Sequence, residues 1–142
     1  MTNIEQFDLL TGILLGDLYT SFPVAIDART DAYLEQVVPP EDGEAAFNFV
    51  QVFTSTVRWL DQYGYIHIEH DYSTLDCYEF KVSLSEKGLH TLRKLPKSLQ
   101  SEDKASIGDM FARGAKRLAD GVATKLVMDA VDFGIQAGIE RI

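Results

Sequence analysis

Apolar residues near the start of the chain recur at steps of three and four positions, the spacing that lines one face of an α-helix. Between positions 4 and 19 the repeat is carried by Ile4, Phe7, Leu10, Leu14 and Leu18. The dipeptide Phe22-Pro23 stops it, because proline cannot continue a helix. We therefore predict a first helix over residues 4–19.

Two short elements are predicted next. Val24 to Ile26 fits a short strand, and Thr30 or Asp31 can cap a second helix that runs to about Val38. The residues from Pro39 to Gly43 then form a turn, since two prolines and a glycine break the helical pattern.

The strongest helical pattern follows this turn. Its apolar face consists of Ala46, Phe49, Val50, Phe53, Val57, Leu60 and Tyr63. Its opposite face is polar and consists of Asn48, Gln51, Ser55, Arg58 and Gln62. The pattern predicts a long third helix with one buried face and one solvent-facing polar stripe. An acidic patch of Glu41, Asp42 and Glu44 lies at the start of this helix, where acid complements the helix dipole.

Two strand-like runs, residues 65–70 and 78–84, come after the third helix and are joined by a polar, turn-rich segment. In them Ile66 and Ile68 are expected to lie opposite the apolar set of Tyr78, Phe80, Val82 and Leu84. This alternation predicts an antiparallel hairpin with one buried face. Ser85 then opens a closing helix that ends before Pro96.

The chain changes character after a polar hinge at residues 97–106. The spacing of apolar residues over 107–142 predicts a helical segment with an apolar face rich in small residues. We expect this segment to mediate homo-oligomerisation. The interface residues that we expect are Ile107, Phe111, Ala115, Leu118, Val122 and Leu126. Packing of the segment on the first domain of the same chain is the alternative. Membrane binding is not expected, because four aspartates interrupt the polar face.

Taken together, the elements define an α+β, mostly helical domain at residues 3–96 with a C-terminal helical extension. Residues 5–95 resemble the winged-helix superfamily. The segment Trp59 to Ile66 resembles the family's junction between the third helix and the first wing strand, and Leu84 to Leu89 resembles its strand-to-helix ending. The resemblance implies three helices, a small antiparallel wing hairpin and a closing helix. In the family the third helix enters the DNA major groove and the wing touches the backbone. The residues that this implicates are Asn48, Gln51, Ser55 and Arg58, with Lys81 on the wing.

The charge of the chain argues against a general nucleic-acid surface. The net charge is −9, and residues 1–95 hold fifteen Asp/Glu against six Lys/Arg, whereas residues 96–142 hold seven of each. All of the excess acid therefore lies on the domain that resembles a winged helix. Phosphate binding needs clustered Lys and Arg, so DNA contact would have to rely on one local face.

No pattern of residues predicts catalysis, a cofactor or a metal site. His67 and Glu69 are expected on one face of their strand and His70 on the other, which leaves too few ligands together. Cys77, the single cysteine, has Asp76 beside it, and acid does not stabilise a thiolate. The chain shows no apolar run long enough to span a bilayer and no secretory signal, so we expect a soluble cytoplasmic protein.

Three functions follow from these observations. The first is a non-catalytic interaction module, in which the winged-helix scaffold presents its acidic patch to an unidentified protein partner and self-associates through the C-terminal helix. The alternative is a small transcriptional regulator that dimerises through the same helix and reads DNA with the third helix. A weaker alternative is an acidic mimic that occupies a nucleic-acid-binding site on a partner.

Overall fold

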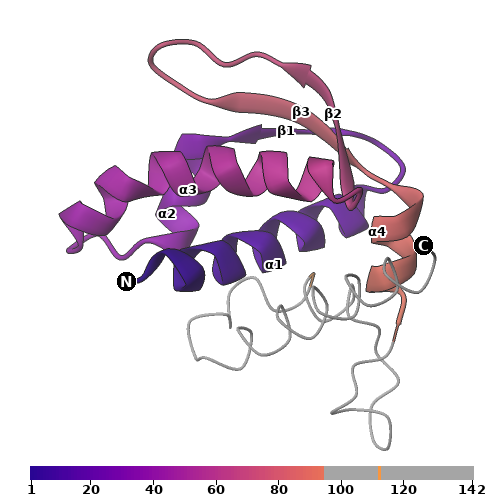
Figure 1. Ribbon diagram of the computed structural model, residues 1–142, viewed down its shortest axis with the longest axis horizontal. Coiled ribbons are helices and arrows are strands. Elements are labelled where there is room, and N and C mark those ends of the chain that lie inside the picture. The colour runs from indigo at the N-terminus through magenta and orange to yellow at the C-terminus, as the bar shows by residue number, and fades with distance from the viewer. Residues whose placement is uncertain (95–111, 113–142) are drawn as a thin grey trace, which may run out of the picture.

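The computed structural model describes residues 1–94 and position 112. In this part of the chain four helices and a three-stranded antiparallel sheet form an α+β fold (Figure 1). The elements in chain order are α1 (Asn3–Ser21), β1 (Ile26–Arg29), α2 (Thr30–Val37), α3 (Gly43–Gln62), β2 (Ile66–Asp71), β3 (Glu79–Leu84) and α4 (Glu86–Leu92).

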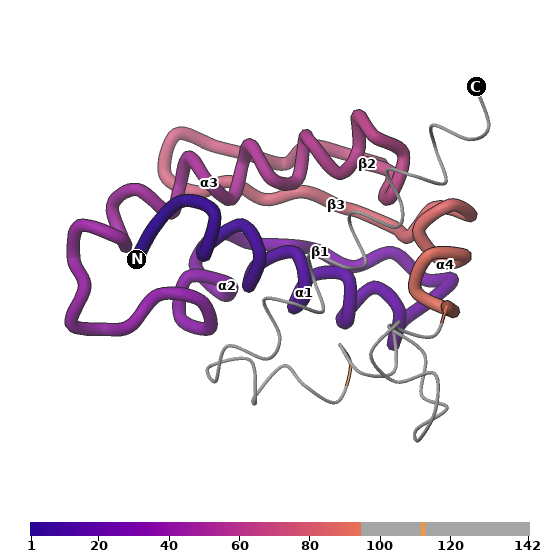
Figure 2. The backbone as a smooth tube through the Cα atoms, turned by 60° about the horizontal axis from the view of Figure 1, so that its bottom comes forward, coloured from indigo at the N-terminus to yellow at the C-terminus, as the bar shows by residue number. Residues whose placement is uncertain are grey.

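Helices α1 and α3 lie side by side and both contact the sheet, α1 at β1 and β3 and α3 at β2, while the β2–β3 hairpin extends beyond them (Figure 1). The strand order is β1-β3-β2, so the hairpin brings β3 to the centre of the sheet. Figure 2 shows α4 beside the C-terminal end of α1, close to the end of the described chain. The described fold is therefore a helical layer and a small sheet that share one core.

Aromatic and aliphatic side chains from three elements fill this core. Leu10 of α1, Phe49 and Phe53 of α3, and Phe80 of β3 are almost completely buried. The rings of Phe53 and Phe80 lie 6.1 Å apart, which joins the helical layer to the sheet. Each such side chain stabilises the fold by about 1.5–3 kcal/mol through burial.

The prediction of a first helix is confirmed, although α1 is longer at both ends than the apolar repeat indicated. Thr2 begins it with a capping box: its side chain accepts a hydrogen bond from the amide of Glu5, and Glu5 accepts one from the amide of Thr2. These two bonds satisfy amides that have no partner within the helix, which explains the early start at Asn3.

The predictions for the next two elements are partly wrong. The strand begins at Ile26 and runs to Arg29, not from Val24 to Ile26, because its pairing with β3 aligns Ile26 with Val82. Helix α2 has Arg29 at its N-cap without a side-chain cap. The hydroxyl of Thr30 instead donates to the carbonyl of Tyr78, 2.9 Å away, and fastens the helix to the sheet.

The buried face of α3 is rotated from the one predicted. Val50 and Tyr63 were expected inside but are 37% and 48% exposed. Val52 and Thr56 are buried in their place, because α3 packs against α1 on that side as well as against the sheet. Asp42 is the N-cap, and its carboxylate accepts a hydrogen bond from the amide of Ala45 at 3.0 Å.

The hairpin is confirmed: Ile66 lies opposite Leu84 and Ile68 opposite Val82, and both partners belong to the expected apolar set. The register then shifts, so that Glu69 is the extra residue of a β-bulge. Beyond β3, Ser85 caps α4 by accepting a hydrogen bond from the amide of Gly88 at 2.9 Å.

The hinge at 97–106, the segment at 107–142 apart from position 112, and the six interface residues predicted in that segment lie outside the described residues, as does Pro96. Within the described part of the chain, no helix is long and apolar enough to cross a membrane.

Candidate interaction groove between α1 and α3

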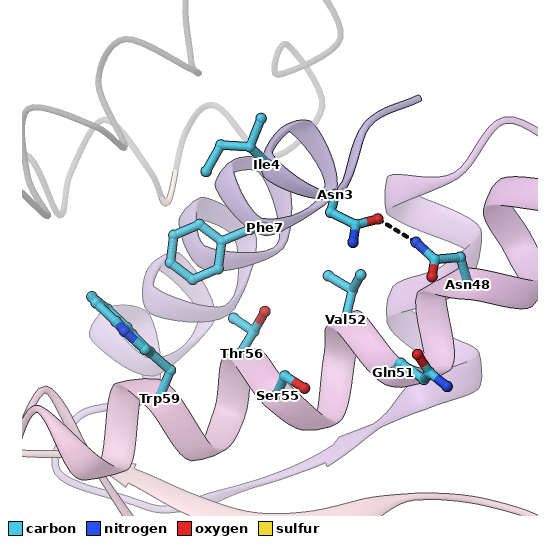
Figure 3. Close-up of a pocket in the computed structure, with 9 residues that line it drawn as sticks. All are labelled: Asn3, Ile4, Phe7, Asn48, Gln51, Val52, Ser55, Thr56 and Trp59. Carbon is cyan, nitrogen blue, oxygen red and sulfur yellow. Dashed lines mark hydrogen bonds between the residues drawn. The ribbon is translucent and has the colours of Figure 1, made fainter.

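A hollow of about 510 Å³ lies where the first turns of α1 meet the outer side of α3 (Figure 3). Three of its lining residues come from α1 and six from α3. They are Asn3, Ile4, Phe7, Asn48, Gln51, Val52, Ser55, Thr56 and Trp59, and we call this hollow the α1–α3 groove. None of these side chains carries a formal charge, which is unusual on a domain with such an excess of acid.

Aromatic rings form one end of the groove. The rings of Phe7 and Trp59 meet edge to face, with centroids 5.4 Å apart and planes at 88°. Behind them, Trp59 lies 4.6 Å from the ring of Tyr63 and stacks on Tyr65 at 6.2 Å. An indole held between neighbours on several sides has little freedom to move, so this apolar surface is preformed.

Amide and hydroxyl groups form the other end and the rim. The side chain of Asn48 donates a hydrogen bond to that of Asn3, which links the start of α1 to α3 (Figure 3). Gln51 and Ser55 are exposed beside it. Ile4 stands on the opposite wall and is 58% exposed. The groove thus combines apolar walls with neutral hydrogen-bonding groups.

The residues predicted to contact DNA or a partner are only partly brought together. Asn48, Gln51 and Ser55 all line the groove, where Asn48 is half-buried and not on a fully solvated face. Arg58 is exposed outside the groove, and its charge helps to lower the pKa of Asp71, after the larger effect of hydrogen bonds from Ser73. Lys81 lies away from α3 on the central strand.

The surroundings of Lys81 do not form a basic surface. On β3 it is paired with Asp27 of β1 on one side and with His70 of β2 on the other. Arg58 and Lys81 are therefore each placed close to acidic side chains. The described chain offers no cluster of Lys and Arg along α3.

One residue of the acidic patch at the start of α3, Asp42, has a structural role. Asp42 caps the helix, and its hydrogen bond to the amide of Ala45 lowers its pKa below the usual value. Glu41 and Glu44 are exposed on either side of it. The patch lies at the Asn48 end of the groove, since Glu44 is one turn before Asn48 on α3.

A second hollow, of about 670 Å³, lies beside α4, and its lining includes the cations Lys87 and Arg93. It is lined by Gly64, His67, Ser85, Glu86, Lys87, Leu89, His90 and Arg93. The ammonium group of Lys87 donates to the carbonyl of Tyr63 at 2.7 Å and lies over the ring of Tyr65. This cation already serves the fold by holding α4 against the end of α3.

The expected separation of the two histidines on β2 is wrong. His67 lies opposite Ser83 and His70 opposite Lys81, and these two residues of β3 share one face of the sheet. The bulge at Glu69 therefore puts both histidines on that same face. Even so, the described residues hold no group of three His, Cys, Asp or Glu side chains placed to bind a metal ion. Cys77 is half-buried in the turn between β2 and β3.

Sequence reasoning missed the aromatic end of the groove. Trp59 lay on neither face of the predicted helix, and Phe7 and Ile4 were assigned to the apolar side of α1. A signal was present, since Val52, Thr56 and Trp59 recur at steps of four and three on one side of α3.

Comparison of the chain with protein-family models, with curated proteins and with solved structures finds no match in any of the three.

Proposed function

We propose that this protein is a non-catalytic interaction module built on a winged-helix scaffold. The succession helix, strand, helix, helix, hairpin, helix, with the hairpin's second strand in the centre of the sheet, supports that architecture. In this proposal the α1–α3 groove, and not a DNA-reading face, is the working surface.

The uncharged lining of the groove is the observation that carries the proposal. A surface for phosphate needs Lys or Arg within reach, whereas apolar walls with a few neutral polar groups suit a segment of protein. The exposed side chain of Ile4 and the rings of Phe7 and Trp59 provide apolar contact area, and Gln51 and Ser55 provide hydrogen bonds at the rim.

The charge around the groove specifies the partner further. Glu5, Glu41 and Glu44 are exposed near it, at the first turns of α1 and α3. The partner that fits is therefore a protein segment with apolar anchor residues flanked by Lys or Arg. Complementary charge would raise its association rate and select it against acidic segments.

DNA reading by α3 is the second candidate, because Gln51, Ser55 and Arg58 are exposed on one side of a helix of 20 residues. It predicts that Arg58→Ala weakens specific DNA binding by about 1–3 kcal/mol. Two observations argue against DNA reading by α3: the acidic patch at the start of the helix and the position of Arg58 near Asp71. The acidic-mimic function would use the acidic patch at the start of α3 and would not use the groove.

The test is capture of partners from native cells by the tagged full chain, with nuclease added to half of each sample. Three baits are compared: the natural chain, Ile4→Glu in the groove, and Val24→Glu as a matched control. Val24 is also apolar and 67% exposed, but it lies in the turn after α1. We expect one nuclease-resistant protein with the natural chain and with Val24→Glu, and its loss with Ile4→Glu.

Enrichment of one DNA region that is lost with Arg58→Ala would contradict this proposal in favour of a regulator. Capture of the same protein by all three baits would show that the groove is not the contact surface. Loss of that protein only on charge reversal at Glu41 and Glu44 would instead support the acidic mimic.

A further inference from the structure

The basic side chains of residues 1–94 are concentrated at one end of the fold. Residues 1–84 hold fourteen Asp/Glu and three Lys/Arg, whereas residues 85–94 hold one Asp/Glu and three Lys/Arg. Residues 85–94 consist of α4 and the positions that flank it. Figure 1 shows α4 at the opposite end of the described fold from the N-terminus. Because like charges repel and opposite charges attract, an anion is drawn to this end of the domain and away from the rest.

The second hollow, of about 670 Å³, lies at this end, and we call it the α4 hollow. Its lining combines residues of α4 and its flanks with residues of the turn and strand that follow α3. The side chains in it that carry or can acquire a positive charge are His67, Lys87, His90 and Arg93. Small-molecule sites have volumes of roughly 300–1,000 Å³, so the α4 hollow has room for a ligand larger than a single ion.

Three of these side chains are accessible to a ligand. His67, His90 and Arg93 are exposed. Within the part of the chain that the structure describes, none of the three side chains makes a hydrogen bond or an ion pair. A guanidinium group presents five N–H donors in a fixed fork, and an imidazole donates one N–H when neutral and two when charged. Such donors match the oxygen atoms of a phosphate group.

The fourth cation, Lys87, is fixed in place. Its ammonium group donates to the carbonyl of Tyr63 at 2.7 Å and lies 4.6 Å from the centre of the Tyr65 ring. An ammonium group has three N–H donors, so two remain. The hydroxyl of Ser85 also donates to the carbonyl of Gly64, which ties the start of α4 to the end of α3. A positive charge is therefore held beside the hollow in advance, which lowers the cost of ordering it on binding.

One acidic side chain, Glu86, also lines the α4 hollow. It is exposed and lies one turn before His90 and two turns before Arg93, at roughly 1.5 Å per residue along α4. A carboxylate repels a phosphate but accepts hydrogen bonds from hydroxyl groups. The hollow thus offers a cationic end at His90 and Arg93 and an acceptor for hydroxyl groups about 10 Å away.

We propose that the α4 hollow binds a small phosphorylated polyol, such as a sugar phosphate. His90 and Arg93 hold the phosphate group, and Glu86 accepts hydrogen bonds from the hydroxyl groups. Phosphate fits better than a carboxylate, because its charge approaches −2 at neutral pH and it has three strong acceptor oxygens. The proposal does not rest on the proposed function, since the α4 hollow and the α1–α3 groove share no lining residue.

The test is calorimetric titration of the full chain with three separate probes: ribose 5-phosphate, inorganic phosphate and ribose. We expect one ribose 5-phosphate to bind per chain, about tenfold more tightly than inorganic phosphate, and ribose not to bind. Arg93→Gln should weaken binding of both phosphates about tenfold, the effect of losing a hydrogen bond to a charged group. Glu86→Gln should bring the two affinities together, because it removes both the repulsion of phosphate and the preferred acceptor for hydroxyl groups.

Arg29→Gln is the matched control. It removes the same charge from an exposed position, but Arg29 lies on β1 and pairs with Asp31. The affinities of this variant should stay within about twofold of those of the natural chain. Arg93 and Arg29 are both exposed, so all chains should unfold at the same temperature, which thermal unfolding checks.

Three outcomes would overturn the proposal. The first is the absence of binding by ribose 5-phosphate and inorganic phosphate. The second is equal binding of the two phosphates that Arg93→Gln and Arg29→Gln weaken equally, because only a general attraction of anions would then be present. The third is a short DNA duplex that displaces ribose 5-phosphate and is itself lost with Arg93→Gln, since the hollow would then belong to a nucleic-acid surface.

Discussion

The ring of Phe7 on α1 meets the indole of Trp59 on α3 edge to face, at 5.4 Å between centroids and 88° between planes. This contact joins two helices that are more than 50 positions apart in the chain and builds the aromatic end of the α1–α3 groove. Edge-to-face aromatic pairs contribute about 0.5–1.5 kcal/mol beyond the burial of their area. The groove therefore has an end that exists before any partner binds.

A double-mutant cycle tests this contact. Phe7→Leu and Trp59→Leu should each destabilise the protein, and their effects on the free energy of unfolding should couple by about 0.5–1.5 kcal/mol. The cycle is measured by urea unfolding followed by circular dichroism. Tryptophan fluorescence cannot be used, because Trp59 is the only tryptophan and one of the changes removes it. Phe7→Leu combined with Phe80→Leu should be nearly additive. Additivity of the Phe7 and Trp59 changes would show that the two rings are not coupled.

Gly88 is required where α4 starts. A Cβ atom at this position would lie 2.1 Å from the carbonyl oxygen of Tyr65 and 2.8 Å from a methyl carbon of Leu84. We expect Gly88→Ala to lower the free energy of unfolding by about 2–4 kcal/mol, since backbone and core must shift. Gly43→Ala is the matched control: a Cβ there meets nothing within 4 Å at the first residue of α3. It should be neutral or stabilising by up to about 1 kcal/mol, and equal losses for both changes would contradict this account.

The buried carboxyl of Asp8 makes stability depend on pH. Its pKa is about 6 in the folded protein against an ordinary value of 3.8, mainly because burial disfavours the charged form. The folded state therefore holds the proton more tightly. The preference of the folded state for the protonated carboxyl therefore adds stability that is complete below pH 3.8. This contribution is lost as the pH rises through 6 and is absent at higher pH.

Asp8→Asn removes this charge and should stabilise the protein at pH 8 by about 1–3 kcal/mol, at about 1.4 kcal/mol per pKa unit. The gain should vanish near pH 4. Denaturant unfolding across that range measures it, with Asp76→Asn in the exposed hairpin turn to correct for net charge. If Asp8→Asn raised the free energy of unfolding by the same amount at every pH, the Asp8 carboxyl would not be the cause of the pH dependence.

The hydroxyl of Thr11 costs stability as it stands. It is buried without a hydrogen-bond partner, and an unsatisfied polar group of this kind costs about 1–3 kcal/mol. Thr11→Val keeps the shape and should raise the free energy of unfolding by about 1 kcal/mol. Thr56→Val, also buried but not among the unsatisfied groups, should not give this gain.

Much of the described architecture could be predicted from periodic patterns. The long helices, the hairpin with Ile66 and Ile68 opposite apolar residues of the second strand, and the helix start at Ser85 follow from local spacing and local chemistry. The start of β1 was misplaced because it depends on pairing with β3, which lies more than 50 positions away in the chain. The face of His70 depends on a bulge that no local pattern marks.

The groove could be predicted only in part. Its polar members, Asn48, Gln51 and Ser55, are visible as one stripe of α3. Its apolar members on α1 are not visible, because helical periodicity does not say which side of α1 faces α3. A helix buried on several sides also has no polar face to orient it, and α1 is such a helix.

The most direct measurement of the central claim uses Trp59 itself. Labelling with 5-fluorotryptophan gives a single ¹⁹F resonance, because the chain has one tryptophan, and this resonance reports from the groove. The protein captured by the natural chain is purified and added, with Ile4→Glu as the control chain. We predict that the resonance shifts as the complex forms and that the Ile4→Glu chain shows neither the shift nor the complex. A complex that forms with an unchanged Trp59 resonance would contradict the claim that the α1–α3 groove binds the partner.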